Sequence, residues 1–121
     1  MKQLVLWVDD LRNPFDDKWN SLATNRKYVS GTPEIVWLKS YDEFVAWFEI
    51  YSQSIDMPFP TLICFDHDLG EELTGFDCVK YLVSFCIDKK IGLPYCTCHS
   101  SNPVGRENIL SYIESYRKSL Q

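Results

Sequence analysis

Thr61-Leu-Ile-Cys-Phe-Asp-His-Asp-Leu-Gly70 is the stretch of sequence that decides the fold of this chain. Its four apolar residues, Leu62 to Phe65, run without a polar interruption between turn-forming residues. Short apolar runs of this kind are typical of strands that are buried on both faces, as in parallel sheets. The run ends in Asp66, His67 and Asp68. Because ligands of open α/β sheets bind at the carboxyl ends of the strands, we expect a functional site there.

The beginning of the chain repeats this pattern of an apolar run followed by acidic residues. Residues 3–8 form a second short apolar run, and Asp9 and Asp10 follow it directly. Residues 34–39 and 94–99 form two further strand-like runs, and the latter ends at His99. If all of these strands are parallel, their carboxyl ends lie on one edge of the sheet. We therefore expect the acids and His99 to meet at that edge.

Helical patterns follow three of these strand-like runs. Their starts are marked by capping residues: Ser40 with Glu43, Thr74 with Asp77, and Asn102 with Pro103. The first of these helices carries aromatic residues at positions 44, 47, 48 and 51, and this spacing places them on one face. We assign this stripe to the core rather than to base stacking. Residues 11–33 contain only a weak helical pattern, and are either an irregular crossover or a functional loop.

This alternation of strands and helices predicts an α/β fold with a parallel sheet of four strands. Helices are expected on both faces, joined to the strands by right-handed crossovers. The length of 121 residues fits a single domain over residues 1–121. A hydrophobic content of 45% is high enough to form a core and argues against disorder.

Composition also restricts the class of function. The net charge of −5 gives no broad basic face for duplex nucleic acid, but leaves a nucleotide, an RNA end or a metal as ligand. The N-terminal apolar run is too short for a signal peptide, and no run of about 18 apolar residues could span a membrane. We expect the five cysteines to be reduced thiols in a cytoplasmic protein. No second cysteine pair accompanies Cys96 and Cys98, so a zinc site with His99 is not expected.

The acids at the two strand ends predict a metal site. Carboxylates that converge within about 4–6 Å repel one another unless a cation neutralises them. Oxygen ligands suit Mg²⁺ or Mn²⁺, and Ca²⁺ is also compatible. The expected ligands are Asp9, Asp10, Asp66 and Asp68. In the alternative interpretation these acids only cap helices and solvate the sheet edge.

The segment after the fourth strand predicts a phosphate site. His99-Ser100-Ser101-Asn102 precedes a helix start, and exposed amides there, with hydroxyl groups and Arg106, could bind phosphate oxygens. His99 is either a general acid or base or a hydrogen-bonded structural residue. Arg12 is either a phosphate clamp or an exposed arginine that is paired with Asp16 or Asp17.

Two features resemble the receiver domains of two-component signalling. They are the acidic pair Asp9–Asp10 and the acid Asp66 at the end of the third strand, which is followed by a Thr-Gly helix start. In receivers, such a pair binds Mg²⁺ and the strand-three aspartate is phosphorylated. This sequence departs from receivers at residues 66–70, which replace the usual Asp-x-x-Met-Pro loop, and at residues 99–102, where receivers carry Thr or Ser.

Four segments resemble more closely the family of cyclic-phosphate processing receiver domains. They are Leu6-Trp-Val-Asp-Asp-Leu-Arg-Asn-Pro14, Phe65-Asp-His-Asp-Leu-Gly70, Thr74-Gly-Phe-Asp77 and His99-Ser-Ser-Asn-Pro-Val-Gly-Arg-Glu-Asn-Ile109. The resemblance spans nearly the whole chain. It implies a receiver-like sheet of strand order 2-1-3-4 that acts on cyclic phosphates of RNA ends or nucleotides.

The primary hypothesis is therefore a metal-dependent phosphoesterase that acts on a cyclic phosphate. The catalytic candidates are His99, Asp66 and Asp68. The phosphate-binding candidates are Arg12, His67, Ser100, Ser101, Asn102 and Arg106. One alternative is a protein that binds a nucleotide or phosphate without turnover. Another is a receiver-derived interaction module that binds no metal; the sequence indicates no particular protein partner.

Overall fold

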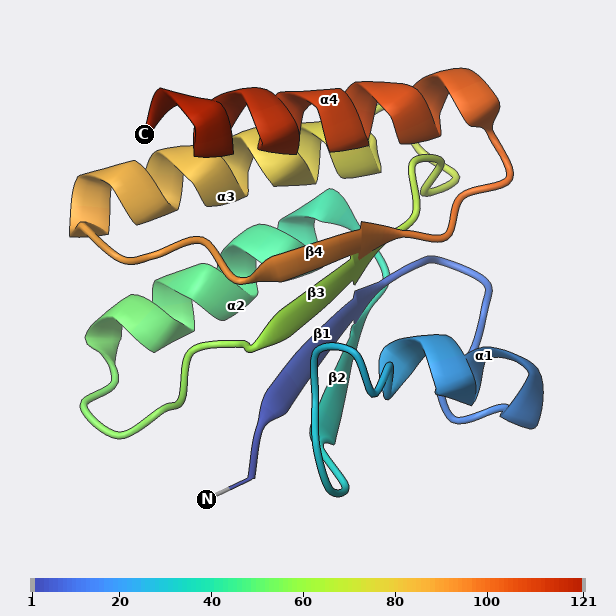
Figure 1. Ribbon diagram of the computed structural model, residues 1–121, viewed down its shortest axis with the longest axis horizontal. Helices are drawn as coiled ribbons and strands as arrows, with labels where there is room; N and C mark the ends of the chain where they lie inside the picture. Colours follow the sequence, from blue (N-terminus) through green and yellow to red (C-terminus); the bar gives the residue numbers. More distant parts are fainter. Residues whose placement is uncertain (1, 121) are drawn as a thin grey trace.

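Four strands and four helices alternate along the chain in the computed structural model, which describes residues 2–120 (Figure 1). The strands are β1 (Leu4–Val8), β2 (Glu34–Leu38), β3 (Leu62–Phe65) and β4 (Tyr95–Cys98). The helices are α1 (Asp17–Ala23), α2 (Tyr41–Gln53), α3 (Gly75–Lys89) and α4 (Pro103–Ser119). All neighbouring strands are parallel, in the order β2-β1-β3-β4. The predicted α/β class and strand order are confirmed.

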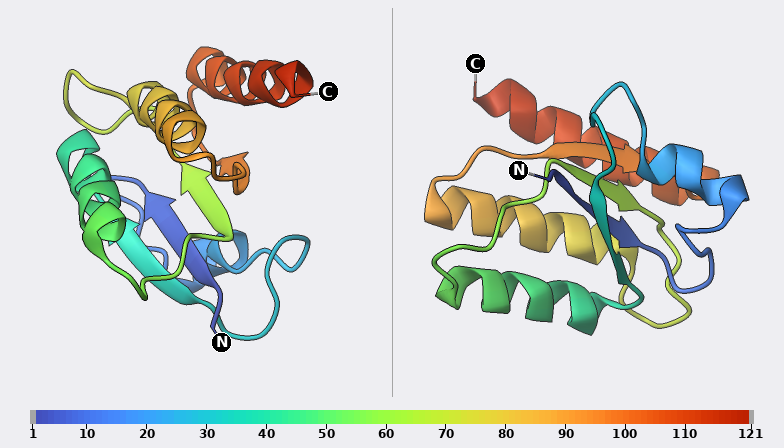
Figure 2. Two further views of the ribbon diagram at one scale, coloured as in Figure 1. Left: turned by 90° about the vertical axis from the view of Figure 1, so that its left-hand side faces the viewer. Right: turned by 90° about the horizontal axis from the view of Figure 1, so that it is seen from below.

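Helices cover both faces of the sheet, but unequally (Figure 2). Successive residues of a strand point to opposite faces. Leu6 and Val8 of β1 therefore pack with α2, α3 and α4, whereas Val5 and Trp7 pack with α1 and the loop that follows it. The aromatic stripe of α2 belongs to the first of these clusters, so its assignment to the core is confirmed.

The long helices begin where the sequence predicts, because side chains satisfy their first amides. The Ser40 hydroxyl accepts a hydrogen bond from the amide of Glu43 at 3.1 Å, while the Glu43 carboxylate accepts from the amide of Lys39. Thr74 and Asp77 form the reciprocal capping box before α3. The Asn102 side chain accepts from the amide of Gly105 at 3.0 Å. These helix starts lie at the carboxyl edge of the sheet, beside the acids.

The segment 11–33 is both a crossover and part of the site. Ala23 and Val29 are buried against the second face of the sheet, so the latter part of the segment covers the core. Its first residues, Leu11 and Arg12, line a cavity at the sheet edge. Only the helix α1 interrupts this loop, as the weak pattern in the sequence indicates.

The remaining structural observations concern the cysteines and the helices. All five cysteines are free thiols, and four of them are buried. Within residues 2–120, none of the helices has the length and apolar character that a membrane crossing requires.

Candidate functional site

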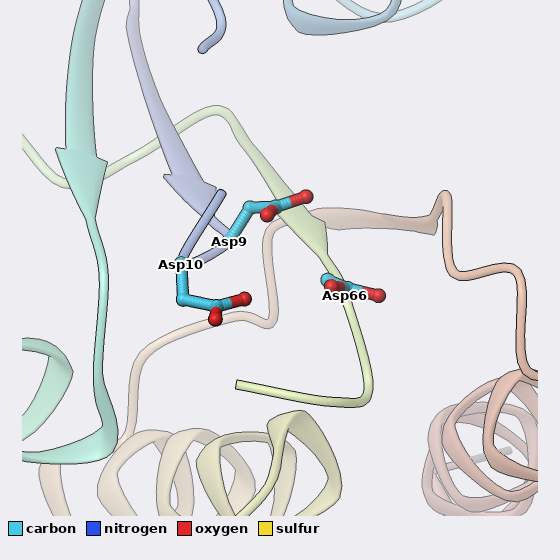
Figure 3. A group of neighbouring side chains, drawn as sticks. All are labelled: Asp9, Asp10 and Asp66. Atoms are coloured by element: carbon cyan, nitrogen blue, oxygen red, sulfur yellow. The ribbon is translucent and has the colours of Figure 1, made fainter. Parts of the chain in front are cut away.

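Three carboxylates meet at the carboxyl edge of the sheet. Asp9 and Asp10 follow β1 and Asp66 follows β3, and these two strands are neighbours (Figure 3). The amide of Asp66 donates to the carbonyl of Val8 at 2.9 Å, so the ladder places the two strand ends side by side. One oxygen from each of the three carboxylates lies within 4.8 Å of the others. The convergence that the sequence predicts is therefore present for these acids.

Asp9 is fully buried and accepts hydrogen bonds at both carboxylate oxygens. Its Oδ1 accepts from the amides of Leu11 and Arg12, each at 2.9 Å. Its Oδ2 accepts from Nη1 of Arg12 at 3.3 Å and lies 2.9 Å from Nε2 of His99. Burial alone would raise the pKa of Asp9, but the hydrogen bonds from His99 and from the two amides outweigh it and lower the pKa.

Asp66 is buried but less well compensated. Its side chain accepts from the amide of His67 at 2.9 Å, and Oδ2 lies 3.4 Å from Nη1 of Arg12. Burial, and then the negative charge of Asp9, raise the pKa of Asp66 above the usual value of an aspartate. The ionised form of Asp66 therefore lowers the stability of the metal-free protein.

The Asp66→Asn variant is expected to be more stable than the wild-type protein at pH 7 without metal, by on the order of 1 kcal/mol. Because the pKa of Asp66 is raised on folding, the penalty of its charge disappears as the pH falls through that raised pKa. Urea unfolding in the presence of a chelator at pH 7 and at about pH 4 measures this difference. A less stable variant at pH 7 would contradict the electrostatic account.

Arg12 places a guanidinium group between Asp9 and Asp66. It is paired with these two acids rather than with Asp16 or Asp17, which corrects that alternative. Its carbonyl accepts from the indole of Trp7 at 2.8 Å, and its guanidinium carbon lies 5.0 Å from the centre of the Trp19 ring. The backbone of Arg12 is thus held by Trp7, and its guanidinium also contacts the ring of Trp19.

A cavity of about 340 Å³ lies over these groups, within the size range of ligand sites. It is lined by Asp9, Asp10, Leu11, Arg12, Asp66, Asp68, Gly70 and Ser101. Of the predicted site residues, it does not include His67, His99, Ser100, Asn102 or Arg106. The cavity lining thus includes all four predicted acids, but only Arg12 and Ser101 of the six predicted phosphate-binding residues.

His67, Asp68 and Asn102 form a second group beside the cavity. Nδ1 of His67 lies 3.0 Å from Oδ1 of Asp68, and the Asn102 amide donates to Oδ2 of Asp68 at 3.2 Å. The ring of His67 packs on the first turn of α4, where a Cβ at Gly105 would lie only 2.3 Å from it. Hydrogen bonds from His67 and Asn102 lower the pKa of Asp68. Asp68 lines the cavity but lies outside the group of three converging acids.

The remaining predicted phosphate ligands make local hydrogen bonds. The Ser100 hydroxyl accepts from the amide of Asn102 at 3.1 Å, and Asn102 also caps α4. Nε of Arg106 donates to the carbonyl of Cys98 at 3.3 Å. Ser101 lines the cavity with the acids. In this arrangement, Ser101 is the member of the segment 99–102 that is best placed to meet a ligand.

His99 lies under the cavity floor rather than in the cavity. Its side chain is 5% exposed and stacks on Trp7, with the ring centres 4.0 Å apart and the planes inclined by 6°. Nδ1 is buried and has no hydrogen-bond partner among the described residues. The sequence analysis did not identify Trp7 or Trp37 as residues of this site. The indole of Trp37 donates to the carbonyl of Asp9. In the sequence, both tryptophans belong to apolar strand-like runs, and no motif marks them as residues of a site.

The donor set fits a divalent cation that prefers oxygen ligands. Three carboxylates face one guanidinium, which leaves an excess of negative charge. Asp10 is only partly buried and lines the cavity, so its carboxylate is available to a ligand. Asp9, in contrast, already accepts four N–H donors. Among residues 2–120, the converging group of possible metal ligands consists of Asp9, Asp10 and Asp66 and does not include Cys96, Cys98 or His99.

Solved structures of response regulators share this fold. A bacteriophytochrome response regulator, AtBRR, superposes with a TM-score of 0.61 at 16% identity, over 93% of this chain and 76% of that chain. The phosphorylated cyanobacterial phytochrome response regulator RcpA gives 0.58 at 16% identity, over 96% and 76%. At this identity the likeness establishes the fold alone. No curated protein matches the chain significantly.

The family comparison identifies the family of the chain, which the structural likeness does not. The sequence profile of the cyclic-phosphate processing receiver domain matches residues 4–115. The match contains all four strands and both strand ends that carry the acids. The chain therefore belongs to the cyclic-phosphate processing receiver domain family.

Proposed function

We propose that this protein hydrolyses a cyclic phosphate ester, of an RNA 2′,3′-cyclic end or a cyclic nucleotide, with the help of Mg²⁺ or Mn²⁺. The observation that carries the proposal is that Asp10, Asp66 and the Arg12 guanidinium line one cavity. Carboxylates suit the cation, and a guanidinium suits the phosphate oxygens. We propose a cyclic phosphate because the chain belongs to the cyclic-phosphate processing receiver domain family.

The charges of the site are consistent with this assignment. A divalent ion together with Arg12 offsets the charge of the three converging carboxylates, which lowers the repulsion that an incoming phosphate meets. When bound, such an ion polarises the phosphate and activates water. Asp10 and Asp66 would hold it, with Asp9 fixed behind them. Arg12 and Ser101 would orient the phosphate oxygens, since both line the cavity.

The reaction consumes one water and involves no oxidation or reduction. The water oxygen bonds to phosphorus, the bond from phosphorus to one ring oxygen breaks, and that ring oxygen takes up a proton. Asp68 lines the cavity and is paired with His67, so we assign the proton transfer to this pair. In a covalent variant, Asp66 attacks phosphorus and water then cleaves the acyl phosphate.

Product analysis by ³¹P NMR tests this function. The purified protein with Mn²⁺ or Mg²⁺ is offered RNA that ends in a 2′,3′-cyclic phosphate and a set of cyclic mono- and dinucleotides, with a chelator control. A ring-opened product that needs the metal supports the enzyme. Unchanged but bound ligand would instead indicate a nucleotide-binding module, and the absence of both turnover and binding would indicate an interaction module without an active site.

A further inference from the structure

We infer that His99 is a positioning residue, which acts through Asp9 to hold the Arg12 guanidinium and exchanges no proton with the substrate. The inference rests on the proposed function, because it assigns a role within that same site. It replaces the general acid or base role that the sequence suggests for His99. Three observations on the ring, on its partner Asp9 and on Arg12 carry it.

The first observation is the position of the ring. His99 is 5% exposed and is absent from the cavity lining, whereas Asp68 and Arg12 line it. One face of the imidazole lies flat on the fully buried ring of Trp7. This stacking fixes the plane of the imidazole and leaves it no rotation toward the cavity. A general acid or base must come within hydrogen-bond reach of the proton that it transfers.

The second observation is the use of the two ring nitrogens. Nε2 lies 2.9 Å from Oδ2 of Asp9, which is itself fully buried. Nδ1 is buried and meets no partner among the described residues. Neither nitrogen of His99 therefore faces the cavity. A proton from Nε2 could reach the cavity only through the Asp9 carboxylate.

The third observation is that His99 and Arg12 share one oxygen. Oδ2 of Asp9 accepts hydrogen bonds from both Nε2 of His99 and Nη1 of Arg12, the latter at 3.3 Å. Oδ1 is held by backbone amides on the other side of the carboxylate. The donor from His99 thus fixes the direction in which Asp9 presents Oδ2 to Arg12. Without that donor, Arg12 keeps its charge but loses its alignment beside Asp66.

The test compares two His99 variants of similar size. His99→Gln keeps an N–H donor near the position of Nε2, whereas His99→Leu fills the space on Trp7 without one. The guanidinium N–H resonances of Arg12, assigned with an Arg12→Lys variant, report its alignment without any substrate. Turnover of the cyclic phosphate identified by ³¹P NMR is the second measurement, and thermal unfolding verifies that both variants fold.

We expect His99→Gln to keep the slowly exchanging Arg12 resonance and a rate close to that of the wild-type protein. We expect His99→Leu to lose this resonance and to lower turnover about 10- to 100-fold, as the loss of an outer-shell partner does. An unchanged Arg12 resonance in His99→Leu would overturn the inference. The inference would also be overturned if His99→Gln kept the Arg12 resonance but lost turnover, because that result would identify His99 as an acid or base. If the wild-type protein shows no turnover, the proposed function fails, while the resonances still decide the positioning role.

Discussion

The Asp66→Asn variant is expected to lower turnover of a cyclic phosphate by at least about 100-fold at a fixed concentration of Mn²⁺. Asparagine keeps the shape of the side chain and an oxygen that can accept from the amide of His67, so the fold is retained. Of the three converging acids, Asp10 and Asp66 line the cavity without being saturated by N–H donors, and the substitution removes the charge of Asp66. Removing a residue that only hydrogen-bonds a metal ligand lowers activity about 10- to 100-fold, and removing a direct ligand should lower it more.

Initial rates from ³¹P NMR, together with the dissociation constant of Mn²⁺, measure the effect. Asp88→Asn is the matched control, since it removes the same charge from an exposed acid. Asp88 lies near the C-terminal end of α3, whereas the N-terminal end of that helix lies beside the cavity. The control variant should behave like the wild-type protein. A rate in Asp66→Asn that equals the control would contradict a role for Asp66 in the reaction.

The Gly75→Ala variant is expected to lose at least about 3 kcal/mol of the free energy of unfolding. A Cβ at Gly75 would lie 1.8 Å from the carbonyl oxygen of Asp66 and 3.2 Å from the Cα of His67. These are backbone atoms, so the first turn of α3 must move away from the end of β3. The gain in helix propensity from alanine, about 1 kcal/mol, is too small to offset this displacement.

Thermal and urea unfolding measure the effect, with Gly92→Ala as control. A Cβ at Gly92 meets nothing within 4 Å, so the control should be as stable as the wild-type protein or slightly more stable. The loss in Gly75→Ala should lower the melting temperature by more than about 10 °C. Equal melting temperatures of the two variants would contradict the close approach of α3 to the backbone of Asp66 and His67.

Most of the fold could be predicted from the sequence because its local signals agree with one another. Four apolar runs became four strands, and three capping sequences became the starts of α2, α3 and α4. Alternating strands and helices then leave few topologies other than a parallel sheet.

The acids of the site could be predicted for the same reason. Asp9, Asp10 and Asp66 follow strands that the parallel arrangement makes neighbours, so topology alone brings them together. The pairing of Arg12 with Asp9 and Asp66 depends instead on how one loop turns back over the strand ends. No sequence spacing encodes that turn.

The burial of His99 illustrates the limit most clearly. From the sequence, His99 is either a general acid or base or a hydrogen-bonded structural residue. In the structure its ring lies on Trp7, and Nε2 is 2.9 Å from the Asp9 carboxylate beneath the cavity. Its environment is set by side chains from β1, which are distant in the sequence. The sequence thus indicated which chemical groups lie near the site, whereas packing determined the direction in which the His99 side chain points.

The acidic cluster of Asp9, Asp10 and Asp66 is expected to bind a divalent cation. Electron paramagnetic resonance of free Mn²⁺ tests it directly, because the signal of the free ion falls as the protein binds it. We predict that the wild-type protein binds one Mn²⁺ per chain, that Mg²⁺ competes for it, and that Asp66→Asn loses the site while Asp88→Asn keeps it. A free Mn²⁺ signal that the wild-type protein leaves unchanged would contradict the account.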